Sequence, residues 1–285
     1  RSTIGILSSV DADANNSFTY TLVSGLGSVD NASFLILGNE LKTNAPLNYE
    51  DKNTYQIRVQ TNDNNGGTFE SAFTITVNDS NDAPTNITLS NNILVENRPI
   101  NSLVGTLTTT DQDSNDVFLY SFANVIGNDN SAFYINGDQI RTNTNFDFET
   151  KQVYTIYVQT TDGFAQFTKQ LVINVVDSND APINVTLNNV TVSENLTIGT
   201  FVGLIYSTDA DANNSFVYTL VNGNGATNNA SFIVRNDSLL TAAVFNFEQK
   251  SSYSIRLRTT DNGGLFYEKQ FEITIENGND EPTDI

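Results

Sequence analysis

Three short acidic segments repeat along the chain at a spacing of about a hundred residues, which is the length of a whole domain rather than of a solenoid unit. Asp79–Pro84 reads Asp-Ser-Asn-Asp-Ala-Pro, Asp177–Pro182 repeats it, and Asn277–Pro282 is a looser copy. Carboxylate, amide and carbonyl oxygens are hard ligands, and a segment that concentrates them before a proline suits a calcium-bound hinge. We therefore expect tandem domains joined by cation-binding linkers.

Other acidic positions recur in register with this motif. Each repeat has an Asp-Xaa-Asp element, a Glu that closes a Leu/Phe-Asn/Asp-Tyr/Phe-Glu element, and an Asp directly after a strand-like segment. These anchors are Asp11, Asp111 and Asp209; Glu50, Glu149 and Glu248; and Asp63, Asp162 and Asp261. A lone Asp-Xaa-Asp could be a solvated Asx-turn. Three ordered sets in three copies favour cation ligands.

The composition excludes several classes of function. Asp and Glu outnumber Lys and Arg by 33 to 13, which gives a formal net charge of −20. Such a surface is a poor partner for nucleic acid or anionic membrane. Cys and His are both absent, so thiolate or His-dependent catalysis and zinc–thiolate sites are excluded. Paired carboxylates could still hydrolyse glycosides, but every repeated acid already has a place in the cation scheme, so we expect no enzyme.

No signal peptide and no apolar run of about 18 residues is visible, so direct membrane insertion is not expected. We expect a soluble, extracellular or cell-surface segment of a longer chain.

The apolar pattern predicts strands. Residues 55–60 and 154–159 alternate polar and apolar side chains, as do 73–77 and 271–275, which is typical of half-buried strands. Asn-Gly and Gly-Gly pairs mark turns between them, and no helical stripe is present. About seven strands in each repeat predict an all-β fold of three tandem Greek-key, immunoglobulin-like sandwiches.

The first repeat is incomplete. Ile4–Leu7 aligns with Val104–Leu107, but the strand that ends before Glu96 in the second repeat has no counterpart. We expect repeats at 1–83, without an N-terminal strand, at 84–181 and at 182–281, with the start of a further repeat at 282–285.

Together these residues resemble the cadherin repeat over nearly the whole chain. Glu96 and Glu194, the Asp-Xaa-Asp elements, Asp147 with Glu149, and the Asn-Asp pairs of the linkers match the family's motifs. Ala83 and Ala181 stand where animal cadherins usually have Asn, a position that offers a backbone carbonyl. The sequence is rich in Asn and Thr, and in this respect it is more similar to bacterial cadherin-like repeats than to animal ones.

The resemblance implies about three calcium ions at the junction of repeats two and three, where charged oxygens surround the linker. The implied side-chain ligands are Glu96, Asp147, Glu149, Asn179, Asp180, Asp209, Asp211 and Asp261, with carbonyls of Ser178, Ala181 and Asn213. Seven of these groups are carboxylates, so about three calcium ions would nearly neutralise them. Without metal, the crowded charges should splay the junction.

The first junction has fewer charges, and the resemblance implies two or three ions there. The implied ligands are Asn48, Glu50, Ser80, Asn81, Asp82, Ala83, Asp111, Asp113, Asn115 and Asp162. Asn48 replaces the expected Asp and the strand-end Glu is missing, so we expect the ion nearest repeat one to be weak or absent. The outer sets, Asp11 with Asp13 and Asp63, and Glu194 with Glu248, Asn279 and Asp280, are half-cages.

Three functions remain open at this stage. The first is a calcium-rigidified adhesin or stalk segment whose partners are neighbouring repeats and another surface protein or glycan. The second is an accessory carbohydrate- or protein-binding module of a secreted polysaccharide-degrading enzyme, which an exposed aromatic row would favour. The third is homophilic adhesion. Because Trp is absent, adhesion by exchange of a Trp is excluded, while contacts along the sandwich sides or strand donation stay open.

Overall fold

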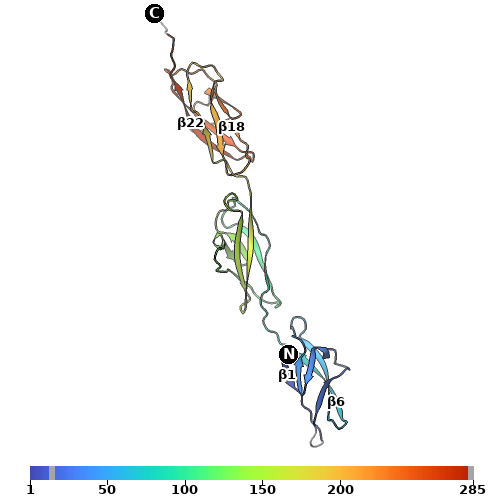
Figure 1. Ribbon diagram of the computed structural model, residues 1–285. Helices are drawn as coiled ribbons and strands as arrows, with labels where there is room; N and C mark the ends of the chain where they lie inside the picture. The colour runs from blue at the N-terminus through green and yellow to red at the C-terminus, as the bar shows by residue number, and fades with distance from the viewer. Residues whose placement is uncertain (13–16, 282–285) are drawn as a thin grey trace.

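Three β-sandwiches lie end to end and give the molecule the shape of an extended rod (Figure 1). The structure is a computed structural model that describes residues 1–12 and 17–281; Asp13 and the expected further repeat at 282–285 lie outside the described residues. The helical segments in this described part are three 3-10 turns, Asn31–Ser33 (η1), Asn130–Ala132 (η2) and Asn229–Ser231 (η3). None of them is long and apolar enough to span a bilayer. The predicted all-β fold is confirmed.

The second and third repeats contain the same strands in the same order. The strands of the second repeat are β7 (Asn86–Leu89), β8 (Ile93–Val95), β9 (Leu103–Thr110), β10 (Leu119–Phe122), β11 (Phe133–Asn136), β12 (Gln139–Thr142), β13 (Val153–Thr161) and β14 (Gln166–Val176). Those of the third are β15 (Asn184–Leu187), β16 (Thr191–Ser193), β17 (Phe201–Thr208), β18 (Val217–Leu220), β19 (Phe232–Arg235), β20 (Ser238–Thr241), β21 (Ser252–Thr260) and β22 (Phe266–Glu276). In each repeat they form two four-stranded sheets, ordered β10-β13-β14-β8 and β11-β12-β9-β7 in the second.

The first strand of these repeats is divided between the two sheets. In the second repeat β7 pairs antiparallel with β9, and β8 then crosses to pair parallel with β14. Counted as one strand, β7 and β8 bring the repeat to the predicted seven. The crossing is fixed by the Asn91 amide, which donates to the carbonyls of Ile93 (2.8 Å) and Val104 (2.9 Å). Gly105 allows this approach, since a Cβ there would lie 2.6 Å from the Asn91 carbonyl oxygen.

The first repeat has two three-stranded sheets, β1-β4-β3 and β2-β5-β6. Its strands are β1 (Thr3–Ile6), β2 (Thr19–Leu22), β3 (Phe34–Leu37), β4 (Glu40–Thr43), β5 (Thr54–Asn62) and β6 (Thr68–Thr76). Among the described residues no strand takes the place of β7 and β8, as predicted. Phe69 on β6 is therefore 69% exposed, whereas Phe167, at the same position of β14, packs against the core.

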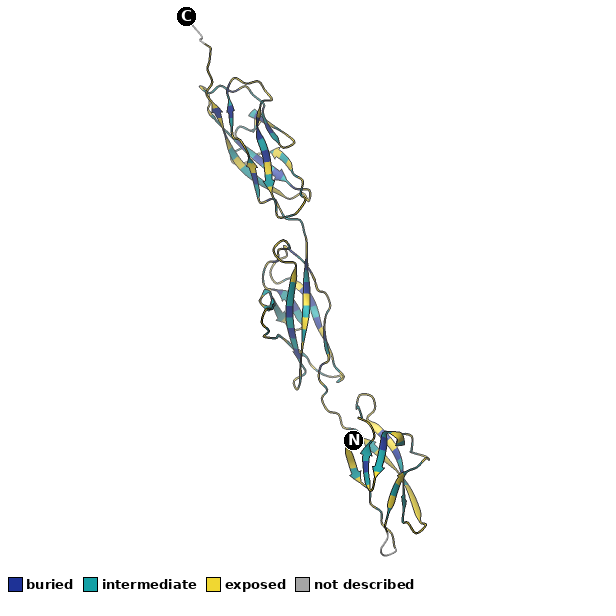
Figure 2. Ribbon diagram, in the orientation of Figure 1, coloured by how far each residue is buried: buried dark blue, intermediate teal, exposed yellow. Residues whose placement is uncertain are grey.

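Each sandwich has its own core between its sheets, so the rod has three separate cores (Figure 2). Alternate residues of the long strands supply them: Ile156 and Val158 on β13 are fully buried, as are Ile255 and Leu257 on β21. The period-two pattern thus places apolar side chains inward. The acidic residues that recur between the repeats lie at strand ends and in loops, whereas Glu70, Glu268 and Glu272 lie within β6 and β22.

The linkers lie between strands, with β6 ending at Thr76 and β7 beginning at Asn86, and β14 ending at Val176 and β15 beginning at Asn184. We propose to divide the chain within them, after residues 83 and 181.

Candidate metal centres between the repeats

In the second and third repeats, the aspartate that follows the long central strand holds a hairpin loop with one oxygen and faces the preceding linker with the other. Oδ1 of Asp162 accepts hydrogen bonds from the backbone N–H groups of Phe164 (2.6 Å) and Ala165 (2.7 Å). Its Oδ2 accepts a hydrogen bond from the Asn81 amide of the linker at 3.2 Å. Asp261 repeats this geometry with Asn179 at 3.1 Å. A hydrogen bond therefore joins each linker to the hairpin loop of the repeat that follows it.

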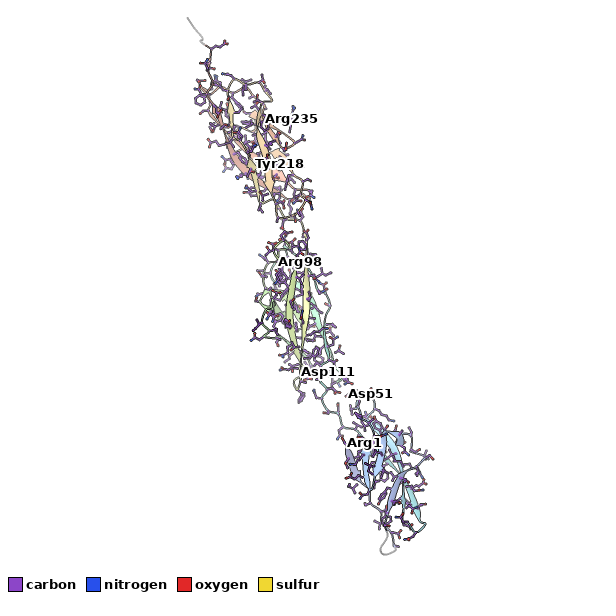
Figure 3. All side chains as sticks on the ribbon, viewed as in Figure 1. Arg1, Asp51, Arg98, Asp111, Tyr218 and Arg235 are labelled. Carbon is purple, nitrogen blue, oxygen red and sulfur yellow. The ribbon has the colours of Figure 1, made fainter. Side chains whose placement is uncertain are left out.

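An acidic group bridges the repeats at both junctions. Glu149 of repeat two, Asp180 of the linker and Asp211 of repeat three each place a carboxylate oxygen within 4.8 Å of the others. Glu50, Asp82 and Asp113 form the same group at the first junction. Figure 3 shows Asp51 and Asp111 on the facing ends of the first two sandwiches. Each group draws its ligands from three separate segments, so a cation bound there would tie two domains and their linker together.

The linker backbone supports each bridging group. The N–H of Asp180 donates to Oδ2 of Asp211 at 2.8 Å, and the N–H of Asp82 donates to Oδ2 of Asp113 at 2.8 Å. The predicted ligands of both linkers thus meet the Asp-Xaa-Asp element of the following repeat.

Glu96 joins a second acidic group on the repeat-two side of the second junction. It is only 2% exposed, and its two carboxylate oxygens accept hydrogen bonds from the backbone N–H groups of Phe148 (2.6 Å) and Ser178 (2.7 Å). One of its oxygens also lies within 4.8 Å of carboxylate oxygens of Glu149 and Asp177. Beyond the third repeat, an equivalent group unites the carboxylates Glu194, Glu248 and Asp280.

Two sequence-predicted ligands have other partners. Asp147 caps its own turn, accepting from the Thr150 backbone N–H at 2.9 Å and hydroxyl at 3.0 Å. Asn48 donates across the first junction to Oε1 of Gln112 at 2.9 Å. Neither belongs to an acidic group of the described residues.

The remaining predicted ligands lie around the junctions. Ser80 and Asn115 line a cleft of about 760 Å³ at the first junction. Ala83, Ala181 and Asn213 are exposed, and Asn213 has a positive φ of 64°. Asp209 accepts a hydrogen bond at Oδ1 from the Asp211 backbone N–H at 3.1 Å.

Sequence reasoning missed two acids that the structure brings into the groups. Asp177 opens the second linker motif and has a copy in Asp79, so its repetition was a usable signal. Asp116 lies with Asp111 and Asp113 in a further group, but the third repeat has Asn214 at that position, so repetition could not reveal it.

Crowded charges change the acidity of these groups. Desolvation, followed by the charges of Glu96, Asp177 and Asp180, raises the pKa of Glu149 against the opposing effect of a backbone hydrogen bond. Hydrogen bonds from the backbone N–H groups of Ala165 and Phe164 lower the pKa of Asp162. The ionised form of Glu149 is therefore destabilised by its neighbours, whereas the ionised form of Asp162 is stabilised by backbone hydrogen bonds.

Several carboxylate oxygens at the junctions are buried and accept no hydrogen bond in the described part of the chain: Oδ2 of Asp111, Oδ2 of Asp116, Oδ2 of Asp209 and Oδ1 of Asp211. Buried charged oxygens require a partner. A hard divalent cation with several oxygen ligands fits this donor set, and the absence of Cys and His disfavours softer metals.

Comparison with known proteins identifies the repeat. Residues 188–276 match the model of the cadherin domain. Protocadherin Fat 1 of Homo sapiens is 28% identical over 251 residues, which are 82% of this chain and 5% of that protein. Fat-like cadherin-related tumor suppressor homolog of Drosophila melanogaster is 30% identical over 226 residues, 74% of this chain and again 5% of the relative. The chain thus spans about one-twentieth of the length of these two relatives.

Solved structures share the fold. Mouse Cadherin-23 EC22-24 superposes with a TM-score of 0.64 at 20% identity, covering 97% of this chain and 92% of that one. The Protocadherin gammaB7 EC3-6 cis-dimer structure gives 0.61 at 20% identity, covering 96% of this chain and 69% of that one. These relatives are cadherins rather than enzymes, while the bacterial origin suggested by the composition stays a prediction. The chain belongs to the cadherin repeat family and is an extracellular, cell-surface segment.

Proposed function

We propose that this chain is a calcium-rigidified segment of an extracellular repeat array that serves as an adhesive arm or stalk of a larger surface protein. The observation that carries the proposal is the bridging group of Glu149, Asp180 and Asp211, whose members come from two domains and the linker between them. Bound calcium supplies positive charge and flexible oxygen coordination. About three ions at the second junction and two or three at the first are proposed.

The charge of the junction explains why rigidity would depend on calcium. Asp177 adds an eighth carboxylate to the seven inferred from the sequence at the second junction. Close pairs of like charges cost on the order of several kcal/mol at an effective dielectric near 20. Without metal these groups push the two sandwiches apart. When calcium is bound, the same side chains stabilise the extended arrangement by linkage, at the modest affinity typical of extracellular modules.

The partners are proposed to be neighbouring repeats of the same parent chain, with another surface protein or glycan as the adhesive target. The Protocadherin gammaB7 structure is described as a cis-dimer, which makes lateral pairing of this array a further proposal. The accessory-module alternative has no specific support. Phe69 and Phe73 lie on the same face of β6. However, β6 is at the sheet edge that the first strand covers in the other repeats, so their exposure follows from the missing strand.

Small-angle X-ray scattering of the chain in EDTA and in a few millimolar calcium tests the proposal, with calorimetry to count the ions. We expect a broad distance distribution in EDTA and a single elongated rod in calcium. Magnesium at the same concentration is the control, because it requires a tighter octahedral site. Asp138→Asn is a charge-matched control variant, since Asp138 belongs to no acidic group of the described residues. An unchanged profile without calorimetric binding would overturn the proposal.

A further inference from the structure

In every repeat, a hydrogen bond between two hydroxyl side chains joins the two sheets near the Asp-Xaa-Asp element. The bonded oxygens belong to Ser9 and Thr61 at 2.9 Å, to Thr109 and Thr160 at 3.1 Å, and to Ser207 and Thr259 at 2.7 Å. In the second repeat Thr109 lies on β9 and Thr160 on β13, which belong to different sheets. We propose that the hydroxyl pairs of the second and third repeats are positioning residues, which hold together the two strand ends on which the preceding linker docks.

Packing of the core alone does not require hydroxyls at these positions. The inward side chains that precede Thr160 on β13 are Ile156 and Val158, and all three residues are fully buried. Val has nearly the shape of Thr and would fill this place without a polar group to satisfy. Every repeat of this chain nevertheless has Ser or Thr at both positions. The bond between the sheets therefore calls for an explanation beyond burial of the side chains.

The position of the pairs along the strands supplies that explanation. Each hydroxyl stands two residues before an aspartate at the end of its strand: Thr109 before Asp111, Thr160 before Asp162, Ser207 before Asp209, and Thr259 before Asp261. The two aspartates of a repeat thus follow strands of different sheets, and the hydroxyl pair joins these strands just before the aspartates. The hydrogen bond consequently limits how far the two strand ends can move apart.

The linker docks on both of these strand ends. The Asn81 amide donates to Oδ2 of Asp162 after β13 at 3.2 Å, and the Asp82 backbone N–H donates to Oδ2 of Asp113 after β9 at 2.8 Å. The second junction repeats both bonds. The two bonds form together only while the strand ends keep their separation, which the hydroxyl pair sets. The same separation sets the spacing of the calcium ligands, a consequence that rests on the proposed function.

Thr160→Val tests this role with little disturbance of the core, because Thr109 still donates to the Tyr120 hydroxyl at 2.9 Å. The first readout needs no metal. Hydrogen exchange of the Asp82 amide in EDTA reports how often the linker leaves its acceptor. We expect this exchange to become several-fold faster in Thr160→Val, because the two docking points are no longer held at a fixed separation.

Terbium luminescence of the full chain gives the second readout, at the first junction alone. Tyr49 lines the same cleft as Asp113, whereas Phe148 occupies the equivalent position at the second junction. Terbium binds to calcium ligands and would be sensitised by Tyr49, and loss of the signal in Tyr49→Phe checks this assignment. We expect Thr160→Val to weaken calcium competition by about tenfold, the lower end of the loss seen when residues that orient metal ligands are changed.

Thr142→Val is the matched control. Thr142 is also buried, at 1% exposure, and its hydroxyl accepts the Ser102 backbone N–H at 2.9 Å. That bond lies at the beginning of β9, at the opposite end of the strand from Thr109. Thr142→Val should therefore lower the unfolding free energy at least as much as Thr160→Val and change neither readout. Thr160→Ser keeps the hydroxyl and should restore both.

The outcomes separate this inference from the proposed function. If Thr160→Val and Thr142→Val give the same amide exchange and the same competition while the unmodified chain binds calcium, the inference is overturned and the proposed function stands. If the Asp82 amide exchanges faster in Thr160→Val but the unmodified chain binds no calcium, the proposed function fails and the positioning of the linker by the hydroxyl pair stands.

Discussion

The first and second junctions each have an equivalent acidic group that bridges the two repeats. Each also has a second acidic group, which lies after the linker at the first junction and before the linker at the second. The shared groups are Glu50, Asp82 and Asp113 at one junction and Glu149, Asp180 and Asp211 at the other. The second junction is also the more enclosed, since Asp261 is 5% exposed while its counterpart Asp162 is only half-buried. The bridging group is therefore the common requirement for joining repeats, and the remaining ligands set how firmly each pair is joined.

The largest expected effect comes from the residue that both groups of the second junction share. Glu149→Gln removes one charged ligand from each group, so we expect calcium affinity at this junction to fall by more than tenfold. Glu50 belongs to only one group, so Glu50→Gln should cost less. Calorimetry compares the two variants. Equal losses would contradict the assignment of Glu149 to two sites.

Repetition explains how much of these sites could be predicted. The bridging groups were predicted because each member recurs at the same offset in several repeats. Asp147 does not recur, since Asn48 and Asn246 stand at its position in the other repeats, and it was assigned as a ligand from the family resemblance alone. In the structure its carboxylate oxygens accept hydrogen bonds from Thr150, three residues ahead. Local capping of this kind competes with distant ligands, and it leaves no mark on the spacing of acids.

The fold shows a similar limit. Alternating apolar residues predicted the strands, and the alignment of the three repeats predicted the absence of the first strand from repeat one; both are confirmed. The same pattern did not predict that β7 and β8 belong to different sheets, since periodicity reports which face is buried and not which neighbour a strand pairs with. Asn91 and Gly105, which fix the crossing, recur as Asn189 and Gly203 in the third repeat, but the alternation of apolar residues does not mark them.

An effect of similar size, on folding and not on calcium affinity, is expected from Glu96, which has a structural role that the first repeat lacks. Glu96→Gln weakens two buried hydrogen bonds to backbone N–H groups, so we expect a loss of about 1.5–3 kcal/mol in the unfolding free energy of repeat two. Chemical denaturation in EDTA measures this loss without metal. Glu194→Gln should cost repeat three a similar amount, because Glu194 accepts from Phe247 and Gly278 at 2.7 Å each. A loss seen only in calcium would instead assign Glu96 to the metal alone.

The enclosed packing of the second junction can be loosened at Gly263. A Cβ there would lie 2.1 Å from Oδ1 of Asn179, so Gly263→Ala should turn the Asn179 side chain away from Asp261. We expect a cost of about 1 kcal/mol for the lost hydrogen bond and a more flexible second junction in scattering. Gly5→Ala is the control, since nothing lies within 4 Å of its Cβ position. Unchanged scattering would show that this contact does not restrain the hinge.

Lowering the pH should stabilise the second junction in the absence of calcium and loosen it in the presence of calcium. The pKa of Glu149 is raised above its ordinary value of 4.5, so in the folded, metal-free junction the carboxyl binds a proton more readily than in the unfolded chain. The metal-free junction therefore loses stability as pH rises through the raised value and regains it as pH falls. In calcium, protons compete for the same oxygens and weaken binding. Scattering at pH 7 and at about pH 5 should show EDTA profiles becoming more compact on acidification and calcium profiles becoming less rigid.

The smallest effect separates the charge of the first junction from its direct contacts. Asn48→Asp restores the carboxylate that repeat one lacks, two residues before Glu50. Gln112, whose Oε1 accepts from the Asn48 amide, can donate to the new carboxylate only after its own side-chain amide turns over. Because the contact with Gln112 is exposed, its own contribution is at most about 1 kcal/mol. We therefore expect calcium affinity at the first junction to rise several-fold and the metal-free chain to become slightly more splayed. A fall in affinity would mean that the Asn48 amide positions the junction better than a carboxylate added to Glu50, Asp82 and Asp113. The hydrogen bond between Asn48 and Gln112, and not the acidic groups, would then be the feature that distinguishes this junction.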